Sequence, residues 1–101
     1  MIVYNITIKI MPQIEKEWIQ WQKEEHIPEI IGTGCFKHAS VFRLLEADES
    51  DGITYVVQYF AENMGQYKRY IEEMAPVLRQ KALDRWGNRF IAFRTVMQAV
   101  E

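Results

Sequence analysis

Two charged or chargeable side chains stand where chemistry is plausible, His26 and Arg94. His26 follows an apolar helical stripe and comes two residues before Pro28. Because a histidine changes its charge near neutral pH, we predict that His26 acts as a general base or contacts a ligand. The alternative is structural, since a histidine at a helix end bonds free carbonyl groups and favours the helix dipole. Arg94 lies mid-strand, where a charge needs either an acidic side chain or an anionic ligand as its partner.

Four uncharged side chains complete the candidate site. We predict His26 as the catalytic residue and the following as ligand-binding residues, together with Arg94: Asn5, Trp21, Gln58 and Tyr59. They would line a cleft between the predicted sheet and its helices. Trp21 comes three residues after Trp18, so the two indoles either stack on an aromatic ligand or pack in the core.

Other kinds of site find little support in the residue spacing. His26, Cys35 and His38 lack a standard zinc-ligand spacing, so we predict no metal site. The Gly32-x-Gly34 run follows a helix and precedes a strand, which is the reverse of a dinucleotide-binding loop. We therefore predict no cofactor. Cys35 is the only cysteine, so it cannot form an internal disulfide, and we expect it to be a small buried strand residue.

Composition narrows the class of protein. A chain of 101 residues predicts one domain, spanning residues 1–101. The net charge of −2, with basic residues scattered among acidic ones, argues against a nucleic-acid partner. There is no apolar run near the ~20 residues of a membrane span and no signal-peptide pattern. These features predict a cytoplasmic protein with no membrane partner.

Hydrophobic periodicity predicts the order β-α-β-β-α-β. The predicted strands and helices are strand 2–11, helix 13–26, strand 35–47, strand 53–60, a helix capped by Asn63 and ended by Gly87, and strand 88–99. Pro28 predicts a break at Ile27, and Pro76 predicts a kink or break near residues 74–75. The order indicates an α+β, ferredoxin-like sandwich. Its antiparallel sheet has strand order 4-1-3-2, with both helices on one face.

One face of such a sheet has no helix over it. Alternation assigns these residues to that face: Val3, Asn5, Thr7, Lys9, His38, Ser40, Phe42, Thr54, Val56, Gln58, Phe60, Phe90, Ala92, Arg94, Val96 and Gln98. The set is too apolar for a bare surface. We therefore predict a homodimer that packs sheet against sheet.

Several of these residues also carry a family resemblance. The run Trp18-x-x-Trp21-x-x-x-x-His26-Ile27-Pro28, followed by Thr33-Gly34-Cys35-Phe36, resembles an uncharacterised family of small bacterial proteins known only as a domain of unknown function. Gln58-Tyr59 and Arg94-Thr95 belong to the same resemblance, which covers nearly the whole chain and implies no activity.

A wider resemblance is to the dimeric α/β-barrel superfamily, which includes cofactor-free and haem-degrading monooxygenases, muconolactone-isomerase-like proteins and the EthD-like family. The Trp followed by His-x-Pro is similar to the EthD-like pattern, and Asn5 is similar to a pocket asparagine of the monooxygenases. Those monooxygenases usually take a further Trp and His from the second half of the chain. Here that half has Trp86 and no histidine.

Two hypotheses on function follow. The first is a homodimer that binds a small, partly apolar ligand in the sheet–helix cleft, with cofactor-free oxygenase- or isomerase-like chemistry as its catalytic form. The second is a non-catalytic structural or regulatory dimer whose interior its own side chains fill. A polar cavity discriminates between them.

Overall fold

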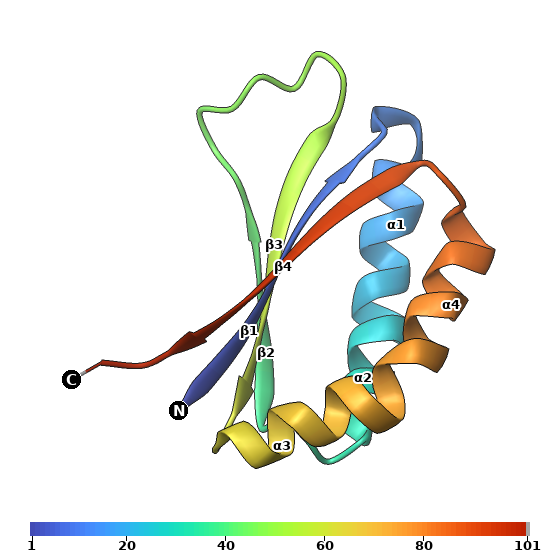
Figure 1. The fold of residues 1–101 in the computed structure, drawn as a ribbon. Helices are drawn as coiled ribbons and strands as arrows, with labels where there is room; N and C mark the ends of the chain where they lie inside the picture. The colour runs from blue at the N-terminus through green and yellow to red at the C-terminus, as the bar shows by residue number, and fades with distance from the viewer. Residues whose placement is uncertain (101) are drawn as a thin grey trace.

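The computed structural model describes residues 1–100 and has a twisted four-stranded antiparallel sheet with all of its helices on one face (Figure 1). The strands and helices, in chain order, are β1 (Ile2–Ile10), η1 (Pro12–Ile14), α1 (Glu15–Trp21), η2 (Gln22–His26), α2 (Ile27–Gly32), β2 (His38–Arg43), β3 (Ile53–Ala61), α3 (Met64–Arg69), η3 (Tyr70–Met74), α4 (Ala75–Trp86) and β4 (Phe90–Gln98). Of the short segments, η1 is a 3-10 helix, and η2 and η3 are π-helical turns. The sheet order β2-β3-β1-β4 confirms the predicted ferredoxin-like arrangement.

The core lies between the sheet and the helices. The two central strands, β1 and β3, alternate strictly between buried and half-buried residues, as the sequence predicts for β1. The buried face of β1 is the predicted one, running from Ile2 to Ile10. Trp18 of α1 and Trp86 of α4 are the largest fully buried side chains. The sheet and the helices thus pack around a core rich in aromatic rings.

The assignment of the two faces of β4 was wrong. Arg94 lies opposite Ile6, and Phe90 lies opposite Ile10. Residues directly opposite in adjacent strands share a face. Phe90, Ala92, Arg94, Val96 and Gln98 therefore face the helices, and the open face carries Ile91, Phe93, Thr95 and Met97 instead. Alternation could not discriminate here, because both sets contain apolar and polar side chains.

The assignment of β2 to the two faces is confirmed. His38, Ser40 and Phe42 lie opposite Phe60, Gln58 and Val56 of β3 on the open face. The strand is shorter than the predicted 35–47, since it begins only at His38. Cys35 is buried as expected, but it precedes the strand.

The first helical segment, which consists of η1, α1, η2 and α2, does not break before Pro28. It continues through a π-turn, η2, in which the backbone N–H of Ile27 bonds the carbonyl of Gln22. A proline ring clashes with the carbonyl four residues before it in an α-helix, and the wider turn displaces that carbonyl. The predicted disturbance near residues 74–75 takes the same form, because the Ala75 N–H bonds the carbonyl of Tyr70 just before Pro76.

The second helical segment, which consists of α3, η3 and α4, begins and ends at the residues that the sequence predicts. The Asn63 side chain accepts a 3.0 Å hydrogen bond from the Gln66 backbone N–H. Gly87 follows α4 with a φ of 60°, which a glycine adopts without strain. No helix within residues 1–100 is long and apolar enough to span a membrane.

Candidate functional site

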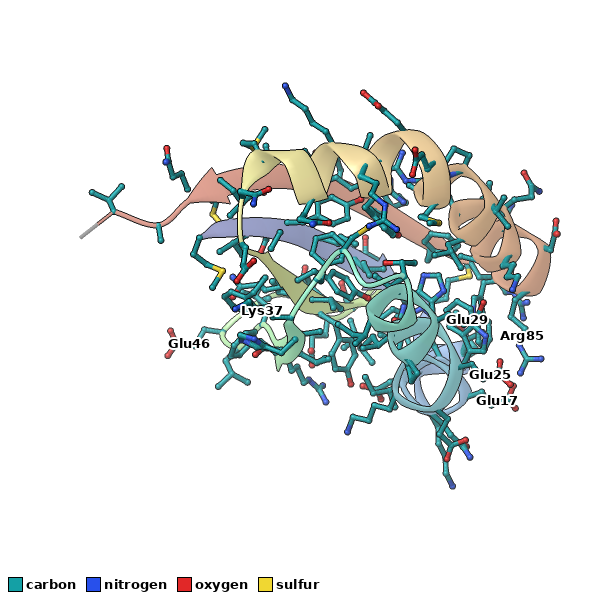
Figure 2. All side chains as sticks on the ribbon, turned by 90° about the horizontal axis from the view of Figure 1, so that it is seen from below. Glu17, Glu25, Glu29, Lys37, Glu46 and Arg85 are labelled. Atoms are coloured by element: carbon teal, nitrogen blue, oxygen red, sulfur yellow. The ribbon has the colours of Figure 1, made fainter. Side chains whose placement is uncertain are left out.

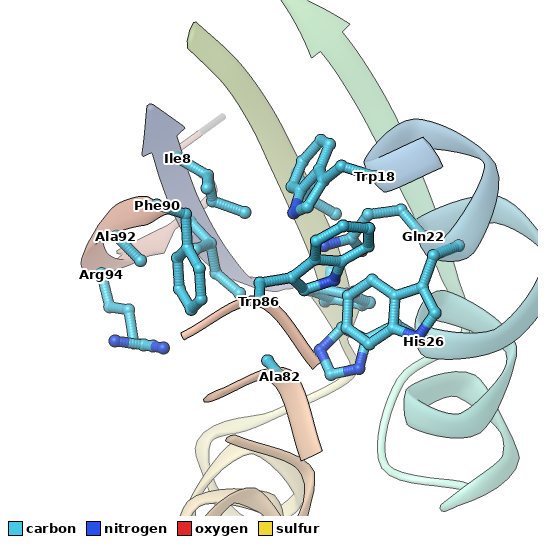
Figure 3. A pocket seen from close by; sticks show the side chains of 13 residues that line it. Ile8, Trp18, Gln22, His26, Ala82, Trp86, Phe90, Ala92 and Arg94 are labelled. Atoms are coloured by element: carbon cyan, nitrogen blue, oxygen red, sulfur yellow. The ribbon is translucent and has the colours of Figure 1, made fainter. Parts of the chain in front are cut away.

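A narrow cavity lies between the sheet and the helical layer (Figure 3). Its volume is about 40 Å³. The lining residues come from β1, β3, β4, α1, η2 and α4, and they are Ile6, Ile8, Trp18, Trp21, Gln22, His26, Val57, Tyr59, Ala82, Trp86, Phe90, Ala92 and Arg94. The walls are mostly aliphatic and aromatic and include all three tryptophans of the chain. A few polar groups in apolar walls are typical of small-molecule sites.

The π-turn η2 places the polar side chains of this cavity. In an α-helix, residues five apart point about 140° away from each other. In a π-turn the hydrogen bond joins residues five apart, so their side chains come to the same side. The His26 imidazole accordingly stacks on the Trp21 indole, with ring centroids 4.5 Å apart and an interplanar angle of 17°. The Trp21 ring in turn meets the edge of Trp86 at 5.8 Å.

Three buried polar atoms of the lining have no hydrogen-bond partner within the described protein. They are Gln22 Oε1, His26 Nδ1 and Trp86 Nε1. Gln22 is 4% exposed and Trp86 is 2% exposed, so bulk water does not satisfy them. A buried polar atom without a partner costs about 1–3 kcal/mol of stability. Three such atoms around one cavity indicate a place for a polar guest.

His26 is uncharged at neutral pH. Its pKa is lowered from 6.5 to about 4, mainly by burial; the charge of Glu29 opposes this lowering, and the cations of Lys81 and Arg94 contribute to it. The neutral ring keeps one N–H and one lone pair for a guest. Burial also raises the pKa of the Tyr59 phenol well above its usual range, so this hydroxyl stays protonated. The deep end of the cavity therefore contains only neutral polar groups.

The structure divides the predicted site residues between the two faces of the sheet. Trp21, His26, Tyr59 and Arg94 line the same cavity. Asn5 and Gln58 lie on the open face, where the Gln58 amide donates a 3.2 Å hydrogen bond to Asn5 Oδ1. Their placement in the sheet–helix cleft was wrong, because both alternate with the buried residues of their strands.

Gln22 and Trp86 belong to the cavity and were not predicted as site residues. Gln22 lies four residues after Trp18, on the same side of the helix, which is a signal that was present in the sequence. Trp86 ends the apolar stripe of the second helical segment, so its residue type alone indicates core packing. Within residues 1–100, no group of three His, Cys, Asp or Glu side chains converges on a metal position.

Solved structures share this fold at low sequence identity. An ethyl tert-butyl ether d (EthD) family protein from Bacillus halodurans superposes with a TM-score of 0.68 at 13% identity, covering 99% of this chain and 100% of that one. An antibiotic biosynthesis monooxygenase gives a TM-score of 0.69 at 11% identity, with full coverage of both chains. SnoaB, a cofactor-independent oxygenase from Streptomyces nogalater, gives 0.62 at 10% identity, covering 99% of this chain and 94% of that one. These likenesses show the fold.

Sequence comparison supplies the family. No curated protein matches the chain significantly. One family model matches residues 1–100, almost the entire chain, and its description is a domain of unknown function, DUF4286. The expected resemblance to a family without an assigned activity is thereby confirmed, and the chain belongs to the DUF4286 family.

Proposed function

We propose that this protein is a homodimer that binds a small, partly apolar molecule in the cavity between the sheet and the helices. The observation that carries the proposal is the set of unpartnered polar atoms on Gln22, His26 and Trp86 around one cavity. A protein that used this space only for packing would be more stable with apolar side chains there. Polar groups kept at a cost to stability are typical of binding sites.

The size of the cavity limits the molecule. One water needs about 10–15 Å³ of such volume, so about 40 Å³ has room for roughly three water-sized groups. The deeply buried part of the guest is therefore short. The aromatic walls, including Trp18 and Trp21, contribute apolar contact area.

The dimer rests on the open face of the sheet. Phe42, Ile91, Phe93 and Met97 are exposed there, and Phe93 is 67% exposed. Apolar side chains gathered on one face usually mark an interface. The same patch on a second copy would cover this one through a two-fold axis, since such an interface is self-complementary.

Chemistry on the bound molecule is the finer part of the proposal. The neutral His26 ring offers a lone pair that can accept a proton from a bound molecule. Its low pKa makes it a weak base in the empty cavity, and a negatively charged guest would raise that pKa. The fold likeness to proteins described as a monooxygenase and a cofactor-independent oxygenase supports this direction. It requires no cofactor.

The alternative is a non-catalytic dimer with a structural or regulatory role. The narrowness of the cavity favours this alternative, because drug-sized ligands occupy about 300–1,000 Å³. In that case two or three ordered waters would satisfy Gln22, His26 and Trp86, as buried waters often do. Binding measurements separate the two functions.

The experiment is a titration of the protein with butan-1-ol, a short apolar molecule with one hydroxyl. The three tryptophan indole N–H signals are followed by NMR, because all three rings line the cavity. We expect the Trp86 signal to move and to saturate. Gln22→Leu should weaken the affinity about tenfold, because it removes one hydrogen bond to the hydroxyl.

Gln20→Leu is the matched control, since Gln20 is exposed on α1 and bonds only Glu24. It should leave the affinity unchanged. The binding proposal is wrong if none of the three indole signals responds. It is also wrong if Gln22→Leu binds the alcohol as well as Gln20→Leu does.

A further inference from the structure

Arg94 is the only charged side chain that lines the cavity. It projects from β4, opposite Ile6, at the edge of the sheet. In Figure 3 it lies on the other side of the cavity from Gln22 and His26, with the rings of Phe90 and Trp86 between them. The cavity therefore has two different polar ends, a neutral one in the helical layer and a cationic one at β4.

Among residues 1–100, Arg94 has neither an ion-pair partner nor a hydrogen-bond partner. Within residues 1–100, five of the twelve lysine and arginine side chains have a carboxylate partner within 4 Å, and they are Lys9, Lys37, Arg43, Arg69 and Lys81. A mid-strand guanidinium over a half-apolar cavity gains most from an anion that can accept two hydrogen bonds.

The surroundings of Arg94 add positive charge. Arg79 of α4 donates to the Tyr4 hydroxyl at 3.0 Å, and its buried Nε has no acceptor among the described residues. Arg79 and Arg94 both counteract the rise in the pKa of the buried Tyr70 phenol, so the positive charge of both acts on that side chain. The field at this end of the cavity therefore favours a negative guest.

Acidic side chains are absent from the lining. The carboxylate whose charge acts on His26 is that of Glu29, which forms a 2.6 Å ion pair with Lys81 between α2 and α4. Figure 2 shows Glu17, Glu25 and Glu29 together at the outer side of the helical layer, near Arg85. The chain has a net charge of −2, yet the wall of its cavity is positive.

We infer that the molecule bound here is a short hydroxy acid, with its carboxylate on the Arg94 guanidinium and its hydroxyl at Gln22 and Trp86. The inference rests on the proposed binding function and adds the chemical class of the ligand. A hydroxyl is the smallest group that both donates and accepts. It can donate to Gln22 Oε1 and accept from Trp86 Nε1–H, which are two of the three unpartnered atoms. A chain of a few carbon atoms fits the small buried volume, with the carboxylate at the exposed arginine.

The test compares three molecules that share one carbon skeleton, 4-hydroxybutyrate, 4-hydroxybutyramide and butan-1-ol. Each is titrated into the protein of 101 residues and followed through the indole N–H signals. We expect 4-hydroxybutyrate to bind about tenfold tighter than the other two, because a hydrogen bond to a charged group adds about 1.5–3 kcal/mol, with the lower value at an exposed arginine. Raising the salt concentration should weaken the binding of 4-hydroxybutyrate and leave the binding of butan-1-ol unchanged.

Arg94→Gln should remove the preference for the acid over its amide. Arg69→Gln is the matched control, because it makes the same charge change at an exposed arginine that pairs with Glu73 on the second helical segment. It should retain the full preference.

The outcomes separate the two levels of the proposal. If butan-1-ol binds and 4-hydroxybutyrate binds no better than its amide, the hydroxy-acid assignment is wrong and the binding function stands. A preference for the acid that survives Arg94→Gln likewise overturns the role of Arg94. If none of the three molecules moves an indole signal, both the binding function and the ligand class are wrong.

Discussion

The two faces of the sheet differ in whether their polar side chains have partners and in whether their apolar side chains are covered. On the open face the side chains of Gln58 and Asn5 are paired at 3.2 Å and those of Lys9 and Asp51 at 2.8 Å, while apolar rings such as Phe93 remain exposed. On the helix face the apolar groups are covered, while polar atoms on Gln22 and Trp86 stay unpartnered. Exposed apolar surface indicates a protein partner, and polar atoms without hydrogen-bond partners around a cavity indicate a small bound molecule.

The largest difference in the free energy of unfolding is expected between substitutions of Trp86 and of Phe93. Trp86→Ala removes a ring that is 2% exposed and packs on Trp21, so it should lower the free energy of unfolding by about 3–5 kcal/mol. Phe93→Glu changes a ring that is 67% exposed in the monomer, and should alter monomer stability by no more than about 0.5 kcal/mol. It should nevertheless convert the dimer to a monomer. Urea unfolding at low protein concentration and light scattering measure the two effects.

The dimer proposal does not survive if the unmodified protein is a monomer at high concentration. The role of Phe93 does not survive if Phe93→Glu still forms dimers. A loss of stability with Phe93→Glu as large as that with Trp86→Ala would contradict the contrast between the faces.

A smaller effect is expected from the charge state of His26. Its pKa is about 4 in the folded protein and 6.5 in the unfolded chain, so between these pH values the unfolded chain binds more protons. Stability should therefore fall as the pH drops from about 6.5 to about 4, by up to about 3 kcal/mol. The charged groups facing the ring are Glu29, Lys81 and Arg94.

His26→Gln should flatten the stability profile between these two pH values, as measured by thermal unfolding. His38→Gln is the control, because the chain's other histidine is exposed on the open face and stacks on Phe60 at 4.3 Å. Equal slopes for the unmodified protein and His26→Gln would mean that His26 is not held uncharged by burial.

The sequence predicts the framework better than the site, for reasons that particular residues show. The strict alternation of β1 fixes its faces, and the capping residue Asn63 marks a helix start. The faces of β4 could not be predicted, because an edge strand with apolar residues at both Phe90 and Ile91 has no amphipathic signal. The position of His26 depends on a π-turn, whereas Pro28 in the sequence predicts a break at Ile27.

The candidate site illustrates a second limit of sequence reasoning. Arg94 was predicted from its charge at a mid-strand position, and Tyr59 is part of the family resemblance; the structure brings both to the cavity. The spacing of Gln22 from Trp18 places it on the buried side of its helix, but that spacing does not show that its side-chain oxygen has no partner. Whether a polar atom has a partner is a property of the packed structure, so no pattern along the chain reports it.

The same substitution on the two faces should have opposite effects, and these are the smallest of the expected changes. Gln22→Leu removes a buried oxygen that has no partner, so it should raise the free energy of unfolding by about 1 kcal/mol. Gln58→Leu removes the donor to Asn5 on the open face and should lower it by about 1 kcal/mol. Thermal and urea unfolding of both variants, in the absence of any added ligand, measure the difference.

If Gln22→Leu proves less stable than the unmodified protein, ordered water already satisfies its oxygen and the cavity is a hydrated part of the core. If it proves more stable and also loses butan-1-ol affinity, the protein keeps Gln22 at a cost to its own stability. A side chain that costs stability and contributes binding is what a ligand site requires and what a packed interior does not. The sign of this one change therefore discriminates between the two functions more directly than its size does.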